Sequence, residues 1–319
     1  MFFSTRQRHG SPAVLLSLLL LWGAMAASLR AAAAAAAAAS AVAAATAATA
    51  ANAAPAATAA TAAAEAADKY AYVVQQLKEA KENLEAAAAA AASGAAAAAK
   101  APLLIAVSKT HPPAAVAAAA ATGHRHFGEN YVAELVEKAQ KLPEDYHWHL
   151  IGKLQTNKVK TLVAGVRNLY SVDSVDSVRL AEVLQRETKK ANRHLNVLVQ
   201  VNAGGEPQKN GVLGDDWNST KHLSLSLVYY ILDKCPNLKF RGFMTVAPQD
   251  VDEALSTFKR MKELKEEAAR DEKIAAALNG EDLELSMGMS RDMQTAVENG
   301  STQVRIGTAI FGARGPRRV

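Results

Sequence analysis

From residue 103 onward, short strand-like segments alternate regularly with helical patterns. Eight strands, each followed by a helix, over about 220 residues are typical of a single (β/α)8 barrel. We therefore predict an α/β fold with one TIM barrel, and a further helix over 70–92 that covers it from outside. The predicted strands are 103–107, 125–128, 147–151, 168–172, 196–202, 240–246, 283–287 and 303–307, and the predicted helices are 131–141, 156–164, 174–191, 223–233, 251–269 and 290–298.

The longest of these helical patterns shows the periodicity on which the prediction depends. Apolar residues that recur at steps of three and four share one face of a helix, and that face is expected to be buried. In segment 251–269 these residues are Val251, Leu255, Phe258, Met261, Leu264 and Ala268.

The first hundred residues differ from the rest of the chain in composition. Residues 1–30 combine basic residues, a leucine-rich apolar stretch over 13–25 and the small-residue sequence Ala24-Met25-Ala26, which is the layout of a secretory signal. The apolar stretch is short for a membrane span. Residues 31–67 are nearly all alanine with scattered threonine, so they can bury little surface. We predict a signal-like leader over 1–30, a disordered low-complexity linker over 31–67 and the barrel over 68–319.

Charge and cysteine content exclude some classes of function. The formal net charge is +5, but Arg6, Arg8 and Arg30 stand in the leader without an acid, so the predicted barrel is closer to neutral. A nucleic-acid partner is therefore not expected. Cys235 is the only cysteine, which excludes a disulfide or a cysteine metal site within one chain. His111, His126 and His149 lack the spacing of metal ligands, and we predict no metal.

Lys109 follows the first predicted strand by two residues. The catalytic and binding groups of such barrels lie at the carboxyl ends of the strands. An ammonium at the mouth of an apolar barrel is costly to desolvate, which lowers its pKa and favours the free amine that a Schiff base requires. The alternative is a lysine that only snorkels or forms a salt bridge.

The segments after the last two predicted strands have the features of an anion site. Segment 286–290 ends a strand with Gly288 and is expected to start a helix at Ser290, and segment 305–308 carries Arg305, Gly307 and Thr308. Phosphate bound by the loops after strands seven and eight recurs in these barrels. An ordinary helix cap at Ser290 and an ordinary turn at Gly307 are the alternatives. Together with Lys109, the two segments predict a pocket for a phosphorylated aldehyde.

Several motifs carry a resemblance to a known family. The longest is Trp148-His-Leu-Ile-Gly-Lys-Leu-Gln-Thr-Asn-Lys158. The commonest form of this motif in the family has phenylalanine or methionine in place of Leu150, and we expect this apolar exchange to be harmless. Further matches are 107–110, 126–131, 170–174, 201–202, 242–244, 285–290 and 304–308. Collinear from about Asp68 to Arg314, the chain resembles the pyridoxal phosphate homeostasis protein family.

The resemblance implies a barrel of the alanine racemase N-terminal-domain type that holds pyridoxal 5′-phosphate (PLP) as a Schiff base on Lys109. It implies phosphate binding by Ser286, Ser290, Gly307 and Thr308. It places Arg305 near the phosphate or near the pyridine nitrogen, and an arginine beside that nitrogen would disfavour its protonation. It also implies that Asn202 and Met244 border the ring.

The function implied by the resemblance is non-catalytic: the protein would carry PLP, limit the free aldehyde and release it to apo PLP-dependent enzymes. A PLP-dependent amino-acid racemase is the alternative, but racemisation needs a second acid or base, which a further domain supplies in the similar racemase. The sequence ends at Val319, so no such domain is expected. A third possibility is an interaction module without cofactor. The family is intracellular whereas the leader suggests a secretory or organellar route, and we expect a monomer with no membrane span in the mature chain.

Overall fold

The computed structural model describes residues 71–72, 75–76, 78–90 and 101–313. The predicted leader and linker lie outside the described residues, so their predictions remain expectations.

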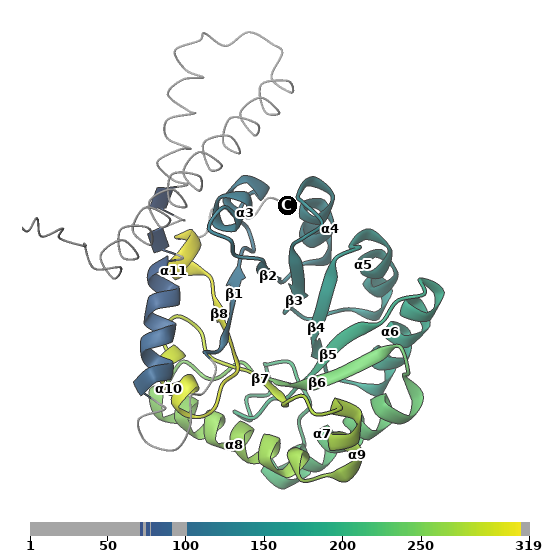
Figure 1. Cartoon of the computed structure of the whole chain (residues 1–319). Helices are drawn as coiled ribbons and strands as arrows, with labels where there is room; N and C mark the ends of the chain where they lie inside the picture. Colours follow the sequence, from purple (N-terminus) through teal and green to yellow (C-terminus); the bar gives the residue numbers. More distant parts are fainter. Residues whose placement is uncertain (1–70, 73–74, 77, 91–100, 314–319) are drawn as a thin grey trace, which may run out of the picture.

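The strands close into a parallel barrel in the order β1-β2-β3-β4-β5-β6-β7-β8, with β8 paired to β1 (Figure 1). This confirms the predicted (β/α)8 barrel. Most strand residues are buried, because helices cover the outer face while side chains fill the interior. The strands are β1 Leu103–Val107, β2 His126–Glu129, β3 His147–Leu150, β4 Leu169–Val175, β5 Leu195–Gln200, β6 Leu238–Met244, β7 Glu284–Ser286 and β8 Gln303–Ile306.

The helices lie around the barrel between successive strands, as predicted (Figure 1). Three predicted starts were wrong, since α7 begins before Leu223, α6 begins after Ser174, which lies in β4, and α10 begins after Ser290. Neither α9 nor α11 was predicted. The helices are α3 Pro113–Ala120, α4 Val132–Lys141, the 3-10 helix η1 Thr156–Lys158, α5 Val159–Gly165, α6 Val178–Lys190, α7 Trp217–Lys234, α8 Val251–Ala269, α9 Glu272–Leu278, α10 Met293–Glu298 and α11 Thr308–Phe311.

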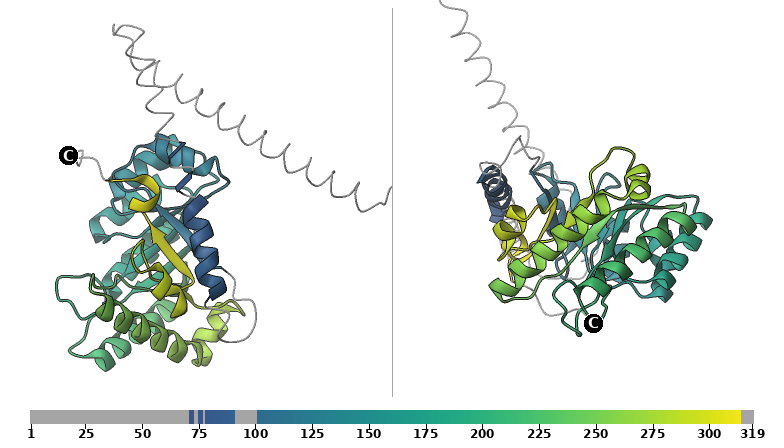
Figure 2. Two further views of the ribbon diagram at one scale, coloured as in Figure 1. Left: turned by 90° about the vertical axis from the view of Figure 1, so that its left-hand side faces the viewer. Right: turned by 90° about the horizontal axis from the view of Figure 1, so that it is seen from below.

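An N-terminal helix, described over 78–90 with the helical residues 71–72 and 75–76, lies beside β8 and the elements around it (Figures 1 and 2). Ala80, Leu84 and Ala87 on this helix are buried in the main hydrophobic core. The prediction of a helix that covers the barrel from outside is thus confirmed for the described residues. None of the helices in the described part of the chain has the length and apolar character needed to cross a membrane.

The pairing of β6 with β7 leaves no room for a side chain at Gly242. This residue pairs with Glu284 and has a φ of +151°. A Cβ atom at Gly242 would lie 1.9 Å from the carbonyl oxygen of Glu284, so the pairing requires a residue without a side chain. Gly242 therefore has a structural role in its motif.

Candidate functional site

The eight predicted site residues lie on five neighbouring strands of the barrel or directly after them. β5, β6, β7, β8 and β1 are consecutive around the closed sheet. Because parallel strands present their carboxyl ends at one rim, this arrangement brings Lys109 to the same end of the barrel as the predicted phosphate residues. From β5 to β1 the residues are Asn202, Met244, Ser286, Ser290, Arg305, Gly307, Thr308 and Lys109.

Arg305 and Ser286 form a buried polar pair between β7 and β8. Arg305 Nη1 donates to Ser286 Oγ at 2.8 Å, and Arg305 Nη2 donates to the carbonyl oxygen of Thr245 at 2.7 Å. Burial lowers the pKa of Arg305, while the carboxylates of Asp173 and Asp292 oppose this shift. A guanidinium stays protonated in proteins, so this side of the site carries a fixed positive charge.

Gly307 follows the last residue of β8 and lies close to the end of β1. A Cβ atom at Gly307 would lie 3.3 Å from the carbonyl oxygen of Val107, the last residue of β1. The absence of a side chain thus lets the segment after β8 approach the segment that leads to Lys109. Thr308 follows as an exposed residue at the start of α11.

Ser290 does not begin a helix, contrary to the prediction. The N-cap of α10 is Asp292, whose Oδ1 accepts a hydrogen bond from the backbone N–H of Met289. This bond folds 289–292 into a turn, which delays the start of the helix. Ser290 is exposed in that turn, on the segment that follows β7.

The side chain of Asn202 forms hydrogen bonds within a loop, whereas that of Met244 is buried at the end of a strand. The side-chain amide of Asn202 donates to the carbonyl oxygens of Glu206 and Lys209, at 2.7 and 3.3 Å, and therefore holds the loop after β5. Met244 is a buried residue at the end of β6. Their predicted position beside a cofactor ring stays a prediction.

Lys109 lies in a tight loop between β1 and α3. The next residue, Thr110, has a φ of +66°, a left-handed conformation that costs a β-branched residue about 1–3 kcal/mol. Ser108 is fully buried, and its hydroxyl donates to Glu129 Oε1 at 2.6 Å. Lys109 itself is half-buried. The loop therefore requires support from its neighbours.

That support includes two residues of α4 that sequence reasoning missed, Glu134 and Lys138. Lys138 is fully buried and forms an ion pair with Glu129, the last residue of β2, which is also fully buried. Burial, and the nearby charge of Glu134, raise the pKa of Glu129 to about 7 against the opposing effect of Lys138. One signal was available in the sequence. Lys138 stands three residues after the buried Leu135, on the inward face of α4.

Comparison with known proteins identifies the family. The sequence profile described as "Alanine racemase, N-terminal domain" matches residues 83–315. The pyridoxal phosphate homeostasis protein of Homo sapiens is 42% identical over 223 residues, which cover 67% of this chain and 77% of that protein. The chain belongs to the pyridoxal phosphate homeostasis protein family. The resemblance in the motifs is thereby confirmed.

Solved structures agree with this assignment to the pyridoxal phosphate homeostasis protein family. The structure of PipY from Synechococcus elongatus with PLP bound is 34% identical, has a TM-score of 0.55 and covers 71% of this chain and 100% of its own. An alanine racemase from Clostridium difficile has a TM-score of 0.54 at 13% identity, covering 76% of this chain and 56% of its own. The racemase likeness concerns the fold alone.

In this family member, a chain of hydrogen bonds joins side chains of the neighbouring strands β2, β3 and β4. Ser171 Oγ donates to Asp173 Oδ1, and His149 Nδ1 lies 2.8 Å from the same hydroxyl oxygen. Since a hydroxyl has one hydrogen, His149 Nδ1 must be the donor to Ser171. In a neutral His149 ring, Nε2 then accepts from His126 Nδ1 at 3.0 Å. His149 is thus a fully buried side chain with both ring nitrogens hydrogen-bonded. No group of residues suited to hold a metal ion occurs in the described part of the chain.

A cavity of about 1110 Å³ lies at the opposite end of the barrel from Lys109. His124, His126 and His147 line it together with the N-terminal helix, and none of the eight predicted site residues does. The amino-terminal face of such barrels contributes to stability rather than to chemistry. Burial lowers the pKa of His124 to about 4 and that of His126 to about 3.

The lowered pKa values of His124 and His126 predict that the folded protein is less stable in acid. Between about pH 6.5 and 4 the unfolded chain binds protons at His124 and His126 that the folded chain does not, so the free energy of unfolding falls as pH falls. Glu129 acts in the opposite direction, because its raised pKa makes the folded state hold the extra proton. Between pH 7 and pH 5 the free energy of unfolding should therefore fall by less in His126→Asn than in the wild type. We expect the difference to be about 1 kcal/mol, allowing for solvent screening.

Urea unfolding at the two pH values measures this effect. Asparagine can still donate to His149 from a position near that of Nδ1. The exposed His222 on α7 provides the matched control His222→Asn, which should show the wild-type fall. An unchanged pH dependence in His126→Asn would show that this ring does not cause the acid sensitivity.

Proposed function

We propose that this chain holds PLP as a Schiff base on Lys109 and takes part in PLP homeostasis without catalysing a reaction. The names of its relatives and the PLP-bound structure of PipY support this proposal. The observation that carries it is the close approach of Gly307 to Val107, which joins the predicted phosphate segment to the segment that bears Lys109.

The residues at this rim fit the phosphate end of the cofactor. The Ser286 oxygen accepts from Arg305, which leaves the Ser286 hydroxyl hydrogen for an anionic oxygen. Thr308 offers a second hydroxyl, and Gly307 lets the backbone come close to a ligand. Ser290 provides a third hydroxyl on the segment after β7. The bond between Arg305 and Ser286 supports a position of Arg305 on the phosphate side rather than at the pyridine nitrogen.

The amine of Lys109 fits the aldehyde end. In its neutral form this amine would take up the aldehyde of bound PLP, and the aldehyde oxygen would leave as water with the two amine hydrogens. Bound PLP supplies a reactive aldehyde, and Lys109 keeps that aldehyde covalently masked. Since imine formation is reversible, hydrolysis of the same bond would release PLP to apo PLP-dependent enzymes.

Borohydride reduction tests the proposal on the full chain. The protein is mixed with PLP, reduced, digested and mapped by mass spectrometry, and we expect the reduced adduct on the peptide that contains Lys109. Incubation with L-alanine, followed by chiral chromatography, should give no more D-alanine than free PLP does. An adduct confined to other lysines would refute the Lys109 assignment, and D-alanine above that background would favour the racemase.

A further inference from the structure

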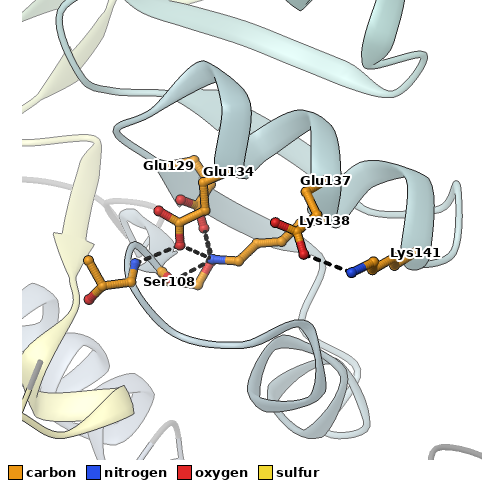
Figure 3. A network of polar contacts seen from close by, with 7 residues as sticks. Ser108, Glu129, Glu134, Glu137, Lys138 and Lys141 are labelled. Carbon is orange, nitrogen blue, oxygen red and sulfur yellow. Dashed lines mark hydrogen bonds and ion pairs between the residues drawn. The ribbon is translucent and has the colours of Figure 1, made fainter. Parts of the chain in front are cut away.

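Both neighbours of Lys109 in the chain are held by side chains of β2 and α4. Figure 3 shows Ser108 beside Glu129, Glu134 and Lys138. The carbonyl oxygen of Ser108 accepts from Lys138 Nζ at 2.7 Å, and the backbone N–H of Thr110 donates to Glu134 Oε1 at 2.6 Å. The loop that bears Lys109 is therefore fixed on each side of this residue by the same group of charges.

Lys138 is the centre of this group. Its ammonium also donates to Glu129 Oε1 at 2.6 Å and to Glu134 Oε1 at 2.7 Å, so its three hydrogens are all used (Figure 3). The Lys138 side chain is 2% exposed and that of Glu134 is 21% exposed. Because the ammonium of Lys138 is buried, it has little freedom to leave these partners. It therefore holds the carboxylate of Glu134 next to the backbone N–H of Thr110.

The conformation of Thr110 explains why this support is needed. Its φ of +66° is disfavoured for threonine, so the loop would relax if nothing opposed the change. The Thr110 hydroxyl is buried and has no hydrogen-bond partner in the described part of the chain. The backbone N–H of Thr110, bonded to Glu134, is the group through which α4 holds this residue.

We propose that Glu134, itself held by Lys138, is a positioning residue for Lys109. It fixes the backbone at Thr110 and thereby directs the lysine side chain toward the rim residues of β7 and β8. A loop that is already ordered loses less freedom when its lysine forms a bond, which strengthens binding. This inference rests on the proposed function, in which Lys109 forms the bond to PLP.

Replacement of Glu134 tests the inference, with Glu137 as the control. Glu134→Ala removes the acceptor of the Thr110 N–H and leaves the buried pair of Lys138 and Glu129 in place. We expect about a tenfold weaker or slower formation of the Schiff base, since a hydrogen bond to a charged group is lost. Glu137 lies on the same helix, is 59% exposed and pairs with Lys141, so Glu137→Ala should bind PLP as the wild type does.

The variant Glu134→Gln separates positioning from charge. Glutamine keeps an oxygen that can accept from the Thr110 N–H but carries no charge, so binding should stay within about threefold of the wild type. Hydrogen exchange of the free protein, followed on peptides that cover 108–112, should be faster in Glu134→Ala and unchanged in Glu137→Ala.

The outcomes distinguish this inference from the proposed function. Wild-type protein that forms no adduct on Lys109 would refute the proposed function. An adduct that forms equally well in wild type and Glu134→Ala would overturn the positioning role alone, as would equal losses in Glu134→Ala and Glu137→Ala. Equal losses in Glu134→Ala and Glu134→Gln would show that the charge acts, and would also overturn it.

Discussion

Lys109→Arg is expected to abolish the visible absorption band that the wild-type protein gains on mixing with PLP. Arginine keeps the positive charge and most of the length of the side chain, but its guanidinium does not lose a proton in proteins and so provides no nucleophilic amine. PLP would then be held only by its phosphate and ring contacts. The loss of the band should be complete, because no other described residue shares the position of Lys109 at the end of β1.

Absorption spectra with and without borohydride measure this effect. Lys153, an exposed lysine after β3, provides the control Lys153→Arg, whose spectrum should match the wild type. Circular dichroism shows whether both variants fold. A visible band that persists in Lys109→Arg and disappears on reduction would mean that a different lysine carries the cofactor.

The second large effect is expected at Gly242, where Gly242→Ala should lower the free energy of unfolding by about 3–5 kcal/mol. The added methyl group would lie 1.9 Å from the carbonyl oxygen of Glu284, so β6 and β7 must separate to admit it. Backbone atoms of a paired strand cannot rotate away as a flexible side chain can. Urea unfolding followed by circular dichroism measures the loss.

Gly300→Ala is the matched control for Gly242→Ala. Gly300 also has a positive φ, +86°, but a Cβ atom there would meet no atom within 4 Å. It should therefore show only the conformational penalty, about 1 kcal/mol. Similar losses in the two variants would contradict the steric argument for Gly242.

The strands could be predicted from sequence more closely than the helices. β1 and α8 have the predicted bounds, because apolar runs and a periodic apolar face reflect burial directly. Even so, Val251, which was assigned to the buried face of α8, is 75% exposed at its first turn. α7 begins at Trp217, since Asp216 caps it through a hydrogen bond to Ser219 N–H, although the residues before Leu223 show no apolar period.

The residues of the candidate site also differ in how well the sequence predicts their positions. The placement of Lys109, Ser286 and Arg305 at one rim could be predicted, because a residue just past or within a barrel strand has a predictable place there. Glu134 and Lys138 were not found, because a glutamate and a lysine four residues apart on a helix usually form an exposed pair, as Glu137 and Lys141 do. The position of Lys138 three residues after Leu135 was a weak signal of its burial. The partners of both side chains depend on how α4 packs against β2 and the loop after β1.

The pairing of β1 with β8 has a consequence for how the protein is made. Ile105 lies opposite Arg305, so the first strand of the barrel is closed by the last one to leave the ribosome. During translation Lys109 emerges long before the residues proposed to hold the phosphate. A nascent chain would therefore expose the lysine without a pocket around it, and the cofactor could be retained only once synthesis of the barrel is complete.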